Sequence, residues 1–148
     1  MERFGTSRGE ARFENGAARI AGACFGAVVA FIGLGGLASG EFGAAAILAG
    51  GLFFSYRALR SATVVLSSSD VELRGFARTR RLRLKDLAAA EVAIGQTGMN
   101  GFGREYLVLH RHDGAKAAFK ELNAKPSPTE STVVHKAARA INDALREP

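Results

Sequence analysis

Cysteine and proline are scarce in this chain, and acidic residues are missing from its most basic segment. The single cysteine, Cys24, cannot form a disulfide within the chain, and it offers no cysteine-based metal motif or cysteine–histidine pair for catalysis. The three prolines are at positions 126, 128 and 148, so proline does not break any strand that the sequence could form before residue 126. The lack of disulfides fits a domain on the reducing side of a membrane.

Charged residues are also missing from two apolar runs on either side of Glu41. The first run, residues 20–38, has 19 residues, and a bilayer core of about 30 Å requires ~20 helical residues, with ~17 as the lower limit. The second run, residues 42–56, has only 15 uncharged residues, but Ala58 and Leu59 extend the span to residues 42–59 if the Arg57 side chain reaches the headgroups. One continuous span would put Glu41 at mid-membrane, which costs a few kcal/mol. The sequence therefore predicts a transmembrane helical hairpin over residues 18–59.

Two other interpretations of these runs stay open. They are also compatible with buried helices of a soluble domain, although a chain of 148 residues has little polar surface to surround two such helices. The first run is also compatible with a signal peptide cleaved after Gly36-Leu37-Ala38. It is longer than the ~7–15 apolar residues usual for such a segment, and a second run follows at once.

The net positive charge lies C-terminal to the apolar runs. Residues 1–56 carry four Arg and four Glu, whereas residues 57–148 carry 16 Lys or Arg against 10 Asp or Glu. Membrane orientation follows the cations near the span ends, and here arginines precede the first span and follow the second, while the turn at Glu41 has none. We expect both termini to be cytoplasmic and Glu41 to be outside.

Small residues recur along both runs. Gly22 and Gly26 form one small-xxx-small pair, Gly36 and Gly40 form another, and the second run is rich in Gly and Ala over residues 43–51. Such faces let two helices approach closely. We expect them to pack the two spans on each other; assembly with a second copy or with another membrane protein is the alternative use.

The apolar period changes to two after Ala62, which indicates β-strands. Before the first span, residues 1–17 show no period and are expected to form a mobile tail. The six expected strands cover residues 62–66, 71–74, 81–85, 88–94, 105–110 and 115–122. The side chains expected on inward faces are Ala88, Ala90, Val92, Ile94, Leu107, Leu109, Ala117 and Phe119.

An amphipathic helix is expected at the C-terminus. Ser127 is placed as its N-cap, Pro128 as its first residue and Glu130 as the partner in a capping box. Its apolar stripe consists of Val134, Ala137, Ala138, Ile141 and Leu145. The fold class is therefore α+β: a transmembrane hairpin followed, over residues 62–147, by a small antiparallel β-barrel or sandwich with a C-terminal helix.

The order of these parts resembles a known family. Two spans are followed by Tyr56-Arg57 and then by residues 74–87, which read RGFARTRRLRLKDL. This arrangement looks like the bacterial pleckstrin-homology (PH)-domain membrane proteins, in which a helical hairpin carries a cytoplasmic PH-like domain. The resemblance covers about residues 18–147 and implies a protein of the bacterial inner membrane with two near-orthogonal sheets closed by a C-terminal helix. It also implies a seventh strand, expected within residues 95–103.

The most basic segment is the candidate binding site. Its cations and one aromatic residue are Arg74, Phe76, Arg78, Arg80, Arg81, Arg83 and Lys85. On a strand, Arg81, Arg83 and Lys85 share the solvent face, whereas Arg80 falls on the face of the leucines. We expect this hairpin to contact anionic lipid headgroups or a membrane-protein partner, with Phe76 presented to the interface. The alternative is a solvated face that protects an edge strand, and nucleic acid is disfavoured because no aromatic stacking platform is interleaved.

No metal, cofactor or catalytic group is expected. The glycine-rich segment 98–103 lacks the Gly-Lys-Ser/Thr ending of a phosphate-binding loop and leads into a strand. His110, His112 and His135 have no carboxylate or cysteine at motif spacing. The sequence thus predicts a non-catalytic membrane protein that docks through its PH-like domain. The alternative is a structural subunit that assembles through its Gly- and Ala-rich spans.

Overall fold

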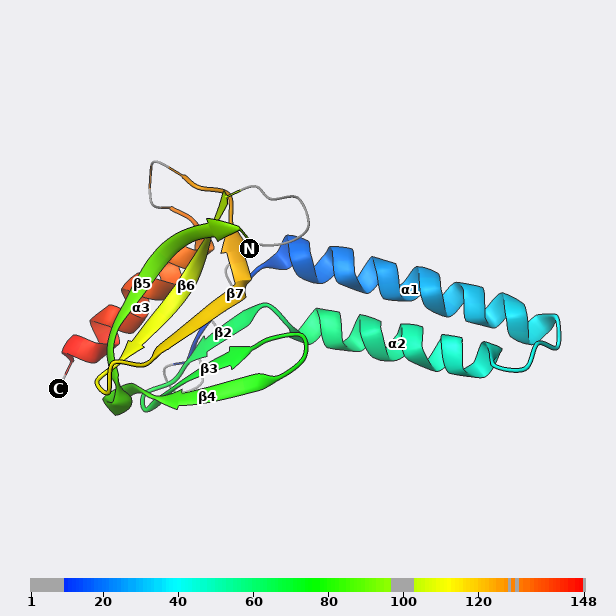
Figure 1. Ribbon diagram of the computed structural model, residues 1–148, viewed down its shortest axis with the longest axis horizontal. Helices are drawn as coiled ribbons and strands as arrows, with labels where there is room; N and C mark the ends of the chain where they lie inside the picture. Colours follow the sequence, from blue (N-terminus) through cyan, green and yellow to red (C-terminus); the bar gives the residue numbers. More distant parts are fainter. Residues whose placement is uncertain (1–9, 97–102, 128, 130, 148) are drawn as a thin grey trace. The chain divides into compact units, whose positions relative to one another are not determined.

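The protein has an α+β architecture that divides into two units (Figure 1). The computed structural model describes residues 10–96, 103–127, 129 and 131–147. One unit, Gly16–Ala62, is helical, and the other combines the residues up to Asn15 with Thr63 and everything after it. We call these the helical unit and the sandwich unit.

The helical unit consists of two antiparallel helices joined by a short turn. Helix α1 covers Gly16–Ala38 and helix α2 covers Ala44–Arg60. The turn contains Gly40 and Gly43 with φ of 75° and 101°, a left-handed region that glycine enters without a steric penalty. The predicted helices and the break between them are confirmed, although α1 begins at Gly16, four residues before the uncharged run.

Small residues bring the two helix backbones into contact. A Cβ added at Gly26, Gly33 or Gly51 would lie less than 3.0 Å from backbone atoms of the facing helix. The Ser55 hydroxyl donates a hydrogen bond across the interface to the Ala23 carbonyl oxygen, at 3.0 Å. The expected use of the small residues for packing the two helices on each other is therefore confirmed.

The sandwich unit contains a four-stranded antiparallel sheet in the order β1-β2-β3-β4. The strands are β1 (Ala11–Glu14), β2 (Thr63–Leu66), β3 (Asp70–Arg74) and β4 (Thr79–Arg83). The expected tail, residues 1–17, is wrong for residues 11–14, which form β1 and pair with β2, with Glu14 opposite Thr63, and for residues 16–17, which begin α1. Residues 1–9 lie outside the described residues. In chain order, the helical unit therefore follows β1 and precedes β2, two strands that pair with each other in the sheet.

The second sheet has three antiparallel strands in the order β5-β6-β7. They are β5 (Leu87–Gln96), β6 (Gly103–Arg111) and β7 (Lys116–Ala124). A 3₁₀ turn, η1 (Leu84–Asp86), connects β4 to β5, so the strand expected over 81–85 ends at Arg83. The described chain has seven strands, and the one that sequence reasoning did not identify is β1. The expectation of a strand within 95–103 falls largely on residues 97–102, outside the described residues.

Helix α3 (Val133–Arg146) packs against β1, β5, β6 and β7 and closes one core with the two sheets. Four residues of its predicted stripe are buried, and Leu145 packs against the core, so the stripe is confirmed. The predicted capping box is wrong: the N-cap is Thr132, whose hydroxyl accepts a hydrogen bond from the His135 backbone N–H at 3.4 Å. Pro128 and Glu130 lie outside the described residues.

Burial along the strands matches the predicted faces in β6 and β7 and departs from them in β5. Leu107 and Leu109 are fully buried and Phe119 nearly so, as predicted, while Ala117 is half-buried. In β5, Ala90 is buried and Val92 packs against the core, but Ala88 and Ile94 are exposed. A register shift between Leu87 and Ala89 explains the exposure of Ala88, because a bulge breaks the two-residue period of a strand.

The edge of β5 is covered by a side chain from α3. The Asn142 side-chain amide accepts a hydrogen bond from the Ala90 N–H and donates one to the Ala90 carbonyl oxygen, both at 2.8 Å. An unpaired strand edge is a site of unwanted association, and this amide replaces a neighbouring strand at one residue. The contact also fixes the position of α3 along the sheet.

Candidate functional site

The predicted basic hairpin is formed by β3, β4 and the turn between them. The Gly75 N–H donates to the Arg78 carbonyl oxygen at 3.0 Å and closes the turn. β4 is an edge strand in the described sheet, and its four residues other than Leu82 are exposed. Phe76 is half-buried, and the presentation of its ring to the membrane stays a prediction.

Three of the six cations form ion pairs with carboxylates. Arg74 pairs with Glu72 at 2.9 Å, Arg81 with Asp70 at 2.8 Å, and Arg83 with Asp86 at 3.0 Å. Arg74 and Glu72 lie two residues apart in β3 and share one face of that strand, whereas the antiparallel register brings Asp70 of β3 next to Arg81 of β4. Residues 74–85 contain no acid, but acids just before them in β3 and just after them in η1 pair with three of their cations.

These ion pairs also shift the pKa values of two of the residues that form them. The pKa of Asp70 is lowered, first by the hydrogen bond from Ser69, and further by Arg81, against an opposing contribution from desolvation. The pKa of Arg74 is raised, mainly by its hydrogen bonds to Glu72. Because these pairs are partly exposed, they organise the surface more than they stabilise the fold. Their three positive charges are largely offset.

The other three cations are Arg78, Arg80 and Lys85. None of them has a carboxylate within ion-pair distance among the described residues. Arg78 lies in the turn before β4, Arg80 lies in β4 opposite Leu73, and Lys85 lies in η1 after β4. Arg80 is therefore on the leucine face as predicted, whereas Lys85 does not share a strand face with Arg81 and Arg83. We call these three residues the β4-edge cations.

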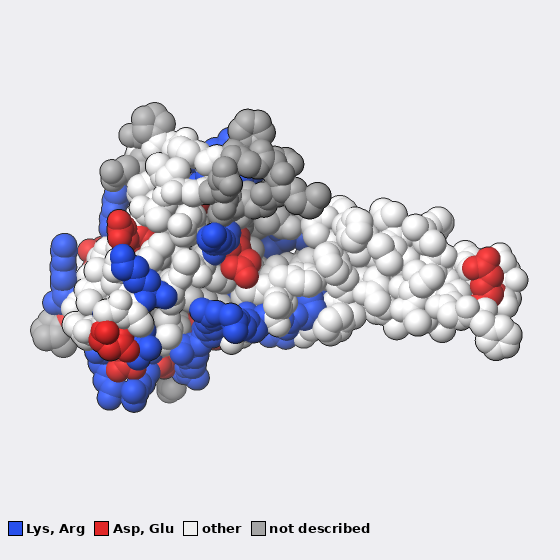
Figure 2. All heavy atoms as spheres, viewed as in Figure 1, with Lys and Arg blue, Asp and Glu red and all other residues white. Residues whose placement is uncertain are grey.

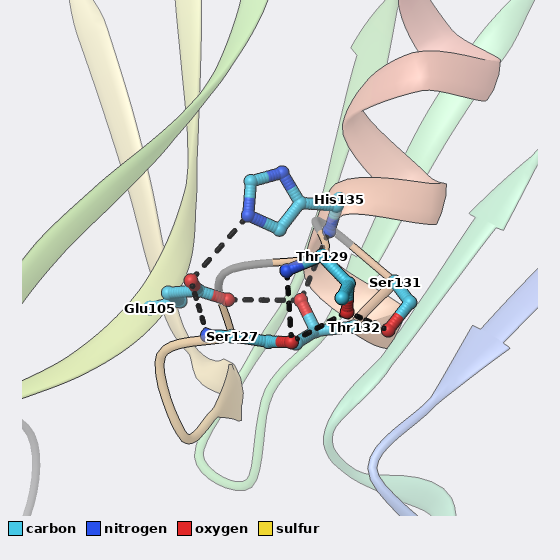
Figure 3. Close-up of polar contacts among 6 residues, drawn as sticks. All are labelled: Glu105, Ser127, Thr129, Ser131, Thr132 and His135. Atoms are coloured by element: carbon cyan, nitrogen blue, oxygen red, sulfur yellow. Dashed lines mark hydrogen bonds and ion pairs between the residues drawn. The ribbon is translucent and has the colours of Figure 1, made fainter.

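A buried carboxylate, which sequence reasoning missed, lies where β6 meets the start of α3 (Figure 3). Glu105 is 4% exposed and accepts hydrogen bonds from the Ser127 N–H at 3.2 Å and the Thr132 hydroxyl at 2.9 Å. The His135 ring nitrogen Nε2 lies 3.4 Å from the same carboxylate. Glu105, Leu107 and Leu109 are spaced two residues apart, so they lie on the same face of β6. This alternation could have predicted that the Glu105 side chain points inward.

The contacts of Glu105 fasten the loop before α3 and the first turn of α3 to the sheet. Burial alone would raise the pKa of Glu105, but the hydrogen bonds from Ser127, Thr132 and His135 outweigh it and lower the pKa. A lowered folded-state pKa means that the carboxylate stabilises the fold above its unfolded pKa, and that this contribution is lost as the pH falls through the folded value. Glu105 therefore has a structural role.

Replacing this carboxylate is expected to destabilise the sandwich unit. Glu105→Gln keeps an acceptor for Ser127 but loses the charge facing His135, so we expect a loss of about 1–2 kcal/mol in unfolding free energy near pH 7. Chemical denaturation followed by circular dichroism measures it. Glu91→Gln is the matched control, because exposed Glu91 contacts His110 at 2.7 Å, and it should cost less than ~0.5 kcal/mol. Equal losses, or a difference that does not shrink in acid, would contradict this role.

The three histidines do not meet. His110 contacts Glu91, His135 contacts Glu105, and His112 is exposed in the β6–β7 turn. Within the described ranges, no group of three or more His, Cys, Asp or Glu side chains is arranged to hold a metal ion.

The face of the helical unit seen in Figure 2 has few charged side chains along most of its length. The described chain exposes fourteen large hydrophobic side chains, and all but Ile94 lie between Ile20 and Leu59. By length and composition, one described helix, α1, can cross a membrane; α2 has 17 residues, at the lower limit for a span.

Comparisons with known proteins add no assignment, since no family model, no curated protein and no solved structure matches the chain.

Proposed function

We propose that this protein is a membrane-anchored docking module without catalytic activity. In this proposal the helical unit spans the bacterial inner membrane as a hairpin, and the sandwich unit is a cytoplasmic PH-like domain that contacts anionic lipid headgroups. The main observation behind this proposal is that the exposed apolar side chains are concentrated on the helical unit.

Water is a poor solvent for the outer surface of this hairpin. Thirteen exposed large hydrophobic side chains lie within 40 residues, from Ile20 to Leu59. Transfer of a fully exposed side chain of this kind to an apolar phase is worth roughly 1.5–3 kcal/mol, and most of these side chains are about half to two thirds exposed, so the set favours a bilayer by on the order of 10–20 kcal/mol. As helices of a soluble protein, α1 and α2 would need a partner over their whole outer surface, whereas a bilayer covers it directly.

The topology of the sandwich unit supports the PH-like interpretation. Seven described strands are divided into sheets of four and three, and a C-terminal helix packs on them. These are the parts that the resemblance implies, with one difference in chain order: the helical unit is inserted after the first strand, between Glu14 and Thr63.

The β4-edge cations are the part of the basic hairpin best suited to lipid. Each cation near an anionic surface contributes about 1 kcal/mol, and the ion pairs of Arg74, Arg81 and Arg83 already offset those charges. Three remaining cations would contribute roughly 3 kcal/mol at low salt, or about a hundredfold in binding. The alternative role as a structural subunit loses much of its support, because Gly26, Gly33 and Gly51 are used within the chain.

Vesicle binding tests the docking role. A variant that lacks residues 17–62, the Δ17–62 variant, keeps all seven described strands and α3. It should sediment with anionic vesicles and not with neutral ones, and binding should fade as the Debye length falls from ~10 Å at 0.1 M salt to ~3 Å at 1 M. Changing the three β4-edge cations to Gln should remove most of this binding.

A control variant that loses the same number of positive charges elsewhere shows whether the position of the cations matters or only the net charge. Lys136, Arg139 and Arg146 lie on the exposed face of α3, and changing all three to Gln also removes three positive charges. This control should bind anionic vesicles nearly as well as the parent. If both triple variants lose binding equally, the effect is net charge alone. If the parent binds no vesicle at low salt, the lipid role is wrong and a protein partner becomes the better candidate.

A further inference from the structure

A second basic cluster lies entirely within the helical unit. The unit has four charged residues in all: Arg19, Glu41, Arg57 and Arg60. The Arg19 Nε donates a hydrogen bond to the Leu59 carbonyl oxygen at 2.6 Å, so the start of α1 adjoins the last turn of α2. Arg57 and Arg60 lie in that last turn. All three cations are therefore at the open end of the hairpin, and the single acid is in the turn at the closed end.

Local contacts hold two of these guanidinium groups in place. Arg60 lies 5.5 Å from the centre of the Tyr56 ring and donates a hydrogen bond to the Tyr56 hydroxyl. Arg19 is held by its bond to the Leu59 carbonyl oxygen, one of the carbonyls left unpaired at the end of a helix. A guanidinium that is already oriented loses less conformational freedom when it binds a phosphate.

Apolar side chains border the cations on the same turns of helix. Ile20 is 64% exposed and Leu59 is 47% exposed, next to Arg19 and Arg60 respectively, and Tyr56 is 55% exposed. Tyrosine, arginine and exposed aliphatic side chains therefore lie at the same level of the hairpin. Proteins have this combination of residues where a membrane meets water. A free anion would use only the arginines, whereas a phospholipid would use both the charged and the apolar groups.

We propose that the open end of the hairpin, made of Arg19, Tyr56, Arg57 and Arg60, binds the phosphate of an anionic phospholipid. Its acyl chains lie along Ile20 and Leu59. This site rests on the proposed membrane insertion of the hairpin, and it is separate from the β4-edge cations. It would keep a shell of anionic lipid around the protein at the inner face of the membrane.

A tryptophan reporter can measure lipid enrichment at this site in the full chain. The sequence contains no tryptophan, so Leu59→Trp places a single fluorophore beside the arginines. The protein is reconstituted in mixtures of phosphatidylglycerol and phosphatidylcholine in which one or the other carries brominated acyl chains that quench tryptophan. At equal mole fraction, brominated phosphatidylglycerol should quench more strongly, corresponding to about fivefold enrichment or more over phosphatidylcholine.

Three variants in the reporter background locate the effect. Changing Arg19, Arg57 and Arg60 to Gln should reduce the enrichment to about one, and changing them to Lys should give an intermediate enrichment, because the positive charge remains while the guanidinium contacts are lost. Changing the exposed α3 cations Lys136, Arg139 and Arg146 to Gln should leave it unaltered. If the Gln triple variant does not insert, Arg60→Gln alone should lower the enrichment at least twofold.

The outcomes separate this proposal from the one on which it rests. Quenching by both brominated lipids shows that the hairpin is in the bilayer, so equal quenching by the two would overturn the lipid site and leave membrane insertion intact. No quenching by either lipid would overturn the insertion itself. Enrichment abolished by millimolar inorganic phosphate would show a site for free anions and overturn the assignment to lipid.

Discussion

Removing residues 17–62 is expected to leave a soluble, folded sandwich unit. Glu14 and Thr63 are directly opposite each other in neighbouring antiparallel strands, so their Cα atoms are only about 5 Å apart. The deletion joins these strands through Asn15-Gly16, and Asn-Gly is the preferred two-residue connection of a β-hairpin. All fully buried large side chains of the sandwich unit remain, since they lie C-terminal to residue 62.

Deleting residues 1–61 instead should give a much less stable protein. This deletion follows the boundary that sequence patterns predict, but it removes β1, whose Ala11 and Phe13 pack against the core. The loss of Phe13 burial is worth about 2–3 kcal/mol, and the edge of β2 becomes open to other chains. Size-exclusion chromatography and chemical denaturation compare the two deletions. Equal stability would mean that β1 contributes nothing, and aggregation of the Δ17–62 variant would contradict the independence of the sandwich unit.

Gly51→Leu is expected to separate the two helices of the hairpin. A Cβ at this position would lie less than 3.0 Å from backbone atoms of Ala30, and a leucine needs far more room than one carbon. Relief requires the backbones to move apart, so the close packing along the whole interface is lost. Gly50→Leu is the matched control, because a Cβ there meets nothing within 4 Å.

Disulfide formation between the helices measures this separation. In a Cys24→Ser background, Gly22→Cys and Ala58→Cys place two thiols across the interface, where the two Cβ positions are 2.8 Å apart. A small outward shift brings them to the ~3.5–4.5 Å of a disulfide. Oxidation should be at least about tenfold slower with Gly51→Leu, a change of roughly 1.4 kcal/mol, and nearly unaltered with Gly50→Leu. Equal rates in both variants would show that the helices do not pack through Gly51.

Periodicity predicted the parts of the fold that depend on local pattern. The uncharged runs predicted α1 and α2, the alternation after Ala62 predicted six strands, and the stripe that includes Val134 and Ile141 predicted α3. These signals work because burial of one face, or of all faces, imposes a period on the chain itself. The inward leucines of β6 were predicted for the same reason.

The features that depend on distant partners were not predicted. β1 has only four residues, and its partner β2 lies beyond the whole helical unit, so its Ala-Arg-Phe-Glu alternation was too short to identify alone. The helix cap was placed at Ser127 because a capping-box pattern begins there, but Thr132 provides the cap. At the candidate site, the cations were identified from composition, whereas the pairing of Arg81 with Asp70 depends on the register between β3 and β4.

Cysteine labelling from one side of the membrane tests the proposed anchoring most directly. In a Cys24→Ser background, Glu41→Cys places a thiol in the turn of the hairpin, and Ser68→Cys places one in the exposed β2–β3 turn of the sandwich unit. In intact bacterial cells, an impermeant maleimide should label position 41 and should reach position 68 only after permeabilisation. Position 41 unreactive in intact cells, or position 68 reactive in them, would contradict a spanning hairpin with a cytoplasmic domain.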